Sequence, residues 1–172
     1  LEFLVMSGME LPLAVMIAIP EPWANNKAMS QTKRDFYQYY ATMMEPWDGP
    51  ASILFSDGDI MGAVLDRNGL RPSRYMITDD DTLILSSEVG VLPIDPTKIK
   101  VKERLRPGKM LLVDTVQGKV IDDEEIKEKY ASRQPYGEWL DNNLTELKSI
   151  HIPNYRVPEY TYEERQRMKK TL

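Results

Sequence analysis

The sequence predicts an α+β fold in which antiparallel sheets are sandwiched with helices. Apolar residues recur at helical spacing within residues 1–50, which indicates helices there. Four short apolar runs follow between residues 51 and 87, about ten residues apart and separated by turn residues, which is typical of antiparallel strands. Two of these runs, 53–55 and 83–85, are continuously apolar. Since such strands are usually covered on both faces, we expect helices or a second sheet on each side.

The first fifty residues predict three helices. Leu1, Leu4 and Val5 share one helical face, and a glycine at position 8 suits the end of that helix. A second helix is expected over residues 11–19, with a proline in its first turn and another proline directly after it. Ser30 is the expected N-cap of the third helix. The first helix lacks its first turn and the last one, after residue 160, stops abruptly, so we expect a chain truncated at both ends.

The middle of the chain predicts a β-meander. Its expected strands are Ala51–Phe55, Ile60–Asp66, Ser73–Thr78 and Thr82–Ser87. The turns between them contain Gly58, the pair Asn68-Gly69 and the run 79–81. Residues 92–108 are predicted to form a proline-rich basic loop. A hairpin over 109–121, turning at Gln117-Gly118, is expected to follow.

The last fifty residues predict helices and a linker. The segment 122–133 is acidic at its start and basic at its end, which matches the dipole of a helix. A second short helix is expected within 135–147. Residues 149–162 are rich in proline and tyrosine, and we interpret them as a linker. A helix is predicted to begin near residue 161.

Composition limits the class of protein. The chain has 172 residues, 42% hydrophobic and 28% charged, which suits one soluble domain or one domain with an extension. A net charge of −5 argues against a nucleic-acid partner. The longest apolar run, 11–19, is shorter than the ~20 residues that cross a bilayer, and no signal peptide is visible. We therefore expect no membrane partner and a cytoplasmic protein.

Residue types exclude several kinds of site. Because the sequence has no cysteine, it cannot form disulfides, cysteine-bound metal centres or a cysteine nucleophile. His151 is the one histidine and lies in "SIHIPNY", so we interpret it as a linker residue rather than a catalytic base. The acidic runs 79–81 and 122–125 lack the spacing and glycine of a calcium loop. No glycine-rich phosphate loop follows a strand. We predict no catalytic, substrate-binding or metal-binding residue in this chain.

The segment "LDRNGLRPSRY", residues 65–75, combines a turn with several charges. Asn and Gly both tolerate positive φ, so their pair at 68–69 predicts a hairpin. The carboxylate at position 66 is close enough along the chain to pair with a neighbouring arginine. We favour a structural turn, and two alternatives stay open: an anion site made by Arg71 and Arg74, and a partner-docking site. The signature turn comprises Asp66, Arg67, Asn68, Gly69, Arg71 and Arg74.

Several segments together carry a family resemblance. "EPWDGPASILFSDGDIMGAVLDRNGLRPSRY", "SSEVGVLPID" and "RPGKMLLVDT", with "PEPW" and "PYGEWL", closely resemble the glutaminase domain of glutamate synthase large subunits. The likeness places 1–140 in the C-terminal part of that class II glutamine amidotransferase domain. It makes 141–172 a linker and the start of the connection to the central domain. "DRNGLRP" is also weakly similar to other class II amidotransferases, so a part of one of those, or a non-catalytic docking module, stays an alternative.

The resemblance implies a fold and a chemistry. The fold is that of N-terminal-nucleophile hydrolases, of αββα type, and this chain would hold part of it. The implied parent hydrolyses glutamine to glutamate and ammonia with an N-terminal cysteine whose α-amino group is the base, beside an oxyanion Asn-Gly pair. Ammonia then reaches a domain with FMN and an iron–sulfur cluster. There it converts 2-oxoglutarate to glutamate, with electrons from an NAD(P)H-oxidising subunit or ferredoxin.

One departure from the family is that the nucleophile is absent. The oxyanion pair and the substrate-binding aspartate of the family belong to segments upstream of the part matched here, so Asn68-Gly69 is not given an oxyanion role. We therefore expect a fragment that is inactive alone and carries no cofactor. Its expected partners are the remaining parent domains, with glutamine as the parent's substrate. Exposed apolar surface predicts that the fragment also self-associates as a homo-oligomer. The expected cytoplasmic location covers both the bacterial cytosol and the plastid stroma.

Overall fold

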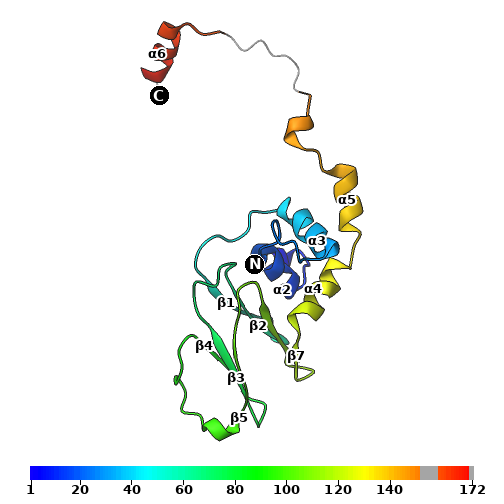
Figure 1. Ribbon diagram of the computed structural model, residues 1–172, viewed down its shortest axis with the longest axis vertical. Coiled ribbons are helices and arrows are strands. Elements are labelled where there is room, and N and C mark those ends of the chain that lie inside the picture. The colour runs from blue at the N-terminus through cyan, green and yellow to red at the C-terminus, as the bar shows by residue number, and fades with distance from the viewer. Residues whose placement is uncertain (152–158, 171–172) are drawn as a thin grey trace. The chain divides into compact units, whose positions relative to one another are not determined.

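The computed structural model describes residues 1–151 and 159–170 (Figure 1). The chain divides into two units, Leu1–Asn142 and Asn143–Leu172, and each is described by itself. Its helices are α1 (Glu2–Met6), α2 (Leu11–Ala18), α3 (Gln31–Ala41), α4 (Asp123–Ala131), α5 (Tyr136–Asn143) and α6 (Tyr162–Lys170), with short 3-10 helices η1 (Pro96–Lys98) and η2 (Leu147–Ser149). Its strands are β1 (Ser52–Ser56), β2 (Ile60–Leu65), β3 (Arg74–Thr78), β4 (Leu83–Ser86), β5 (Ile99–Arg104), β6 (Met110–Asp114) and β7 (Lys119–Ile121).

The predicted capping signals set the helix boundaries. Pro12 lies in the first turn of α2, and the helix ends just before Pro20. The hydroxyl of Ser30 accepts a hydrogen bond from the backbone amide of Lys33 at the start of α3, at 3.4 Å. Asp122 accepts one from the amide two residues later at the start of α4, at 2.9 Å. These three predicted helix starts are confirmed. Ser30 and Asp122 each satisfy an amide that the helix itself leaves open, whereas α2 begins with a proline in its first turn and has no side-chain cap.

The strands form two antiparallel sheets. Sheet A has the order β1-β2-β6-β7, and sheet B has the order β4-β3-β5. In sheet A, Leu54 stands opposite Ala63, which stands opposite Leu111. One residue further along β1, Phe55 stands opposite Gly62, and a side chain at Gly62 would collide with the Phe55 ring. The absence of a side chain at Gly62 therefore leaves room for the Phe55 ring.

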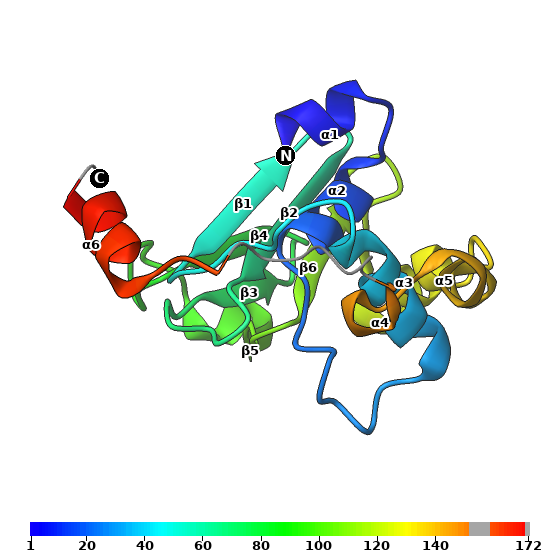
Figure 2. The same ribbon diagram turned by 90° about the horizontal axis from the view of Figure 1, so that it is seen from above.

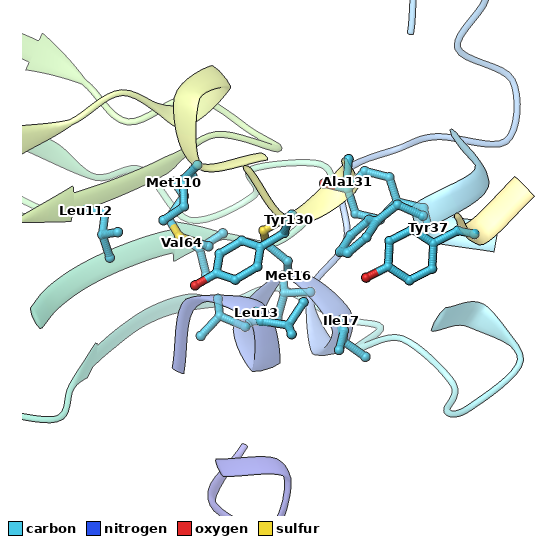
Figure 3. Close-up of a cluster of buried hydrophobic side chains, with 14 residues drawn as sticks. Leu13, Met16, Ile17, Tyr37, Val64, Met110, Leu112, Tyr130 and Ala131 are labelled. Carbon is cyan, nitrogen blue, oxygen red and sulfur yellow. The ribbon is translucent and has the colours of Figure 1, made fainter. Parts of the chain in front are cut away.

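Helices cover one face of sheet A, and sheet B covers part of the other. The main core joins α2, α3 and α4 to side chains of β2 and β6, among them Val64 and Leu112 (Figure 3). A smaller cluster on the opposite face, made of Ala63, Leu65, Leu105 and Leu111, packs against side chains of β3 and β4. The layers of the first unit are thus helices, sheet A and sheet B. This confirms the predicted α+β class with antiparallel sheets and helices.

Two predictions about the strands are wrong. The four strands do not form one meander, because β1 pairs with β2 in sheet A whereas β3 pairs with β4 in sheet B. Residues 66–73 therefore cross between the sheets and do not form the predicted hairpin. The segment predicted as a basic loop contains β5, which pairs with β3. Charged residues alternate with Ile99 and Val101 there, and prolines flank the run, so its period of two was missed.

The expected cover on both faces of the apolar runs is wrong for β1. Ile53 and Phe55 pack against the main core. Leu54, between them, points to the opposite face and is 65% exposed. The continuous apolar run 53–55 therefore forms a strand, but one face of that strand is exposed in the first unit.

The second unit contains η2 and α6. Its predicted linker, 149–162, falls partly on residues 152–158, which lie outside the described residues. His151 is exposed. Each described helix is too short or too polar to cross a membrane.

Candidate functional site

Segments that are far apart in the sequence meet at one surface cleft. The cleft has a volume of about 620 Å³ and is lined by residues 19–26, Pro46, Trp47, Arg67, Pro107 and Gly108. It therefore collects the "PEPW", "EPWDGP", "DRNGLRP" and "RPG" segments that the sequence singled out. Two tryptophans and four prolines give its wall an aromatic and apolar character, and Arg67 and Glu21 contribute one charge of each sign.

Asp66 holds the turn that follows β2. Its side chain is 4% exposed and accepts hydrogen bonds from the backbone amides of Ala51 (3.0 Å), Asn68 (3.1 Å) and Leu70 (3.2 Å). The amide of Ala51 precedes β1, so one carboxylate joins the start of β1 to the chain leaving β2. Gly69 completes the turn with φ of +60°.

The environment of Asp66 favours its ionised form. Burial alone would raise the pKa of this carboxyl. Hydrogen bonds from the backbone amides of Ala51, Leu70, Asn68 and Gly69 act in the opposite direction, and the net result is a pKa below the ordinary value. The amide hydrogen bonds of this buried carboxylate support the structural turn that the sequence favoured.

The arginines of the signature turn do not pair with Asp66, contrary to the prediction. Arg67 pairs with the exposed Asp48 at 3.1 Å on the rim of the cleft. Arg71 lines a separate hollow of about 480 Å³ beside β1 and β4. Arg74 lies in β3, directly opposite Arg104 of β5. The three arginines thus have three different sets of neighbours, and Arg74 is not among the residues that line the hollow beside Arg71.

Two glycines fit the cleft wall together. A Cβ on Gly69 would lie 2.3 Å from Cγ of Pro107, so the signature turn sits directly against the "RPG" turn. Gly108, which follows Pro107, has φ of +68°, and a Cβ added to it would lie 3.1 Å from Cβ of Glu21. The signature turn, the "RPG" turn and the "PEPW" loop are therefore stacked against one another behind the cleft.

A cluster of charged side chains contacts the "PEPW" loop and the "RPG" turn. Lys127 of α4 is 3% exposed, and its ammonium group contacts Glu21 (3.2 Å), Asp123 (3.0 Å) and the backbone oxygen of Gly108 (2.5 Å). Asp123 also accepts a hydrogen bond from the amide of Met110, at 2.8 Å. The cluster extends through further ion pairs and contains three cations and three carboxylates, which are Lys33, Lys109, Lys127, Glu21, Asp123 and Glu124.

The ion pairs change the acidity of the cluster. Hydrogen bonds from Lys109 and then Lys33 lower the pKa of Glu124 to about 2. Burial, and then the nearby Glu21 carboxylate, raise the pKa of the Tyr37 hydroxyl well above its usual range, and this hydroxyl donates to Glu21 at 3.1 Å. Three carboxylates of the acidic helix start predicted at 122–125, those of Asp123, Glu124 and Glu125, therefore pair with lysines.

Sequence reasoning missed the buried lysine. Position 127 lies four residues after Asp123 and three before Tyr130, both on the buried side of α4. Helical spacing alone would have placed Lys127 on that side. Since a buried lysine needs a partner, this spacing was the signal for the ion pair.

The arrangement positions backbone segments around the cleft, and it supplies no cysteine nucleophile. The charged side chains behind the cleft are held by one another, and the sequence has no cysteine. In the described part of the chain no three His, Cys, Asp or Glu side chains are grouped so as to hold a metal ion.

Comparison with known proteins places these residues in a family. Residues 1–139 match the family model of glutamine amidotransferases class-II. The chain is 45% identical to the glutamate synthase [NADPH] large chain of Bacillus subtilis over 96% of its length, and 52% identical to the glutamate synthase [NADH] of Schizosaccharomyces pombe over 87%. It is 48% identical to ferredoxin-dependent glutamate synthase 2, chloroplastic, of Arabidopsis thaliana over 86%. The matched parts are 12%, 7% and 9% of those proteins, so the chain spans about a tenth of their length or less.

Proposed function

This chain belongs to the class-II glutamine amidotransferase family, and from this premise we propose that it is the non-nucleophilic part of the glutaminase of a glutamate synthase. The observation that carries the proposal is an identity of 45–52% to glutamate synthases over most of the chain. A different class II amidotransferase is not favoured, because the relatives compared above are all named as glutamate synthases. An independent docking module is not favoured either, since 1–139 match the amidotransferase family itself.

The parent protein would hydrolyse glutamine and use the product. Water and glutamine give glutamate and ammonia. Reductive amination of 2-oxoglutarate by that ammonia, with two electrons from NAD(P)H or reduced ferredoxin, gives a second glutamate and water. This chain has no cysteine, so the attacking thiolate comes from another part of the parent. Its own contribution is sheet A with its helical cover, the packed sheet B and the cleft held by Asp66 and Lys127. An αββα fold of the N-terminal-nucleophile type would be completed by that other part.

The cofactors of the parent would lie outside this chain. An iron–sulfur cluster is bound by thiolates, and the sequence has none. No glycine-rich phosphate loop follows its strands. Relatives named for NADPH, NADH and ferredoxin are all 45–52% identical to this chain, so NAD(P)H or ferredoxin is the proposed electron donor of the parent. Bacterial cytosol and plastid stroma both remain proposed compartments. The remaining parent domains are the proposed partners.

A chimeric enzyme tests the proposal. The matched segment of the Bacillus subtilis large chain is replaced by this chain, and ammonia release from glutamine is measured. The isolated chain, assayed in parallel, should release no ammonia above an enzyme-free control. Ammonia release by the isolated chain that persists through repeated purification would contradict the proposal.

A further inference from the structure

One side of the first unit has two bare strand edges next to each other. β1 is an edge strand of sheet A, paired with β2 alone in the described part of the chain (Figure 2). β4 is an edge strand of sheet B. Both strands line the same hollow, to which β1 contributes Ser52 and Leu54 and β4 contributes Leu85 and Ser86. The two sheets therefore end on the same side.

Between the two sheets, an apolar slot faces solvent. It has a volume of about 390 Å³ and is lined almost wholly by apolar side chains of β1, β2, β4 and β6. Leu54 is 65% exposed and Met61 is 53% exposed at its edge. Leu83 and Leu85 form the opposite wall. The apolar surface therefore continues from the smaller core between the sheets to the β1 edge, where it is exposed.

The edges on the two sides of the unit differ in chemistry. Natural sheets protect exposed edges with charged side chains, prolines or bulges. β5, at the far edge of sheet B, has four charged residues in "IKVKER" and a register shift against β3. β7, at the far edge of sheet A, begins with Lys119. β1, "SILFS", and β4, "LILS", contain no charged residue. The far edges are thus built to face solvent, whereas the β1 and β4 edges are not.

We propose that the β1 edge accepts an extended strand from the rest of the amidotransferase domain, whose alternate apolar side chains fill the slot beside Leu54 and Met61. This inference rests on the proposed function, because the partner is the part of the domain that this chain does not contain. Such a strand would satisfy the outer amides and carbonyls of β1 and cover the slot at the same time. A second copy of this chain is the competing occupant.

Hydrogen–deuterium exchange tests the inference in the chimeric enzyme. The outward amides of β1 should exchange at least about tenfold more slowly in the chimera than in the isolated chain at a concentration where it is monomeric. This protection should not change when the chimera is diluted. Equal exchange in the two proteins would overturn the inference. Protection that disappears on dilution would also overturn it, because the occupant would then be a second copy.

A matched pair of substitutions gives a second readout. Leu54→Lys puts a charge into the slot, whereas Val116→Lys changes a side chain that is 75% exposed in the turn between β6 and β7. In the chimera, Leu54→Lys should lower the melting temperature, and Val116→Lys should leave it unchanged. Equal melting temperatures for both variants would overturn the inference. If the β1 amides of the chimera are protected but it releases no ammonia, only the proposed function is refuted. If it releases ammonia but the β1 amides are unprotected, only the proposed pairing of a strand with the β1 edge is refuted.

Discussion

The Asp66 carboxylate accepts a hydrogen bond at 3.0 Å from the backbone amide of Ala51, fifteen residues earlier in the chain. This contact joins the entry of β1 to the exit of β2. It lies beside the point where the chain leaves sheet A for sheet B. The same side chain holds the amides of Asn68 and Leu70, so a single buried acid sets the path between the two sheets.

Asp66→Asn should destabilise the fold by about 3 kcal/mol, because the amide group of asparagine would turn a donor toward backbone donors. Thermal and chemical unfolding of the two proteins measures the difference. Asp48→Asn, which affects an exposed ion pair with Arg67, is the matched control and should change stability by no more than about 0.5 kcal/mol. In the parent enzyme, Asp66→Ala should mainly lower the melting temperature and change KM for glutamine little. A large rise in KM with little change in melting temperature would instead indicate a ligand-binding role for Asp66.

The same acid predicts a pH dependence. The pKa of Asp66 is lower in the folded state than its ordinary value, so its contribution to stability is complete above about pH 5. That contribution is lost as the pH falls below about 4, toward the folded-state pKa. The difference in unfolding free energy between wild type and Asp66→Asn should therefore shrink as the pH falls through this window. A difference that grows on acidification would contradict the assigned sign.

Gly69→Ala should be more destabilising than Gly118→Ala. Both glycines have nearly the same φ, +60° and +62°, so the backbone strain of an added side chain is matched. The Cβ at position 69 would collide with Pro107, whereas position 118 has no atom within 4 Å. We expect an additional loss of about 1–3 kcal/mol at position 69, read from the melting temperatures of the two variants. Equal losses would mean that the two turns are not packed together.

Lys127→Met should cost about 3 kcal/mol, because it leaves the carboxylates of Asp123 and Glu21 without their buried cation. Lys119→Met removes an exposed pair with Glu125 and serves as the control, with an expected change below about 1 kcal/mol. Urea unfolding of both variants gives the comparison. A Lys127→Met variant as stable as the control would show that the cluster is not a support of the cleft.

The isolated chain should self-associate through the β1 edge. Light scattering over a range of concentrations should show a rising mean mass, and Leu54→Lys should suppress the rise because a lysine protects an edge strand. Val116→Lys should not suppress it. A strictly monomeric profile for the wild-type chain at all concentrations would contradict this prediction.

Local signals in the sequence predicted the elements that local chemistry determines. Ser30 and Asp122 are caps that act on amides two or three residues away, so their helices could be placed without knowing the rest of the fold. Gly118 reverses the chain within one hairpin, and the turn at 117–118 is confirmed. The family resemblance was likewise carried by short segments that can be read one at a time.

Long-range contacts determine what the sequence did not predict. The Asn68-Gly69 pair is a strong hairpin signal, yet β2 and β3 do not pair, because Asp66 bonds to Ala51 and Gly69 packs on Pro107. Ala51 and Pro107 both lie far along the chain from the turn that they contact. The cleft could not be predicted for the same reason. Its wall combines loops from four separate parts of the chain.

Ammonia release from glutamine by the chimeric Bacillus subtilis enzyme tests the central claim most directly. If this chain is the non-nucleophilic part of a glutamate synthase glutaminase, the chimera should release ammonia at a rate within about tenfold of the unmodified enzyme. The isolated chain should release none. A chimera that folds, as judged by its melting temperature, but releases no ammonia from glutamine would contradict the claim.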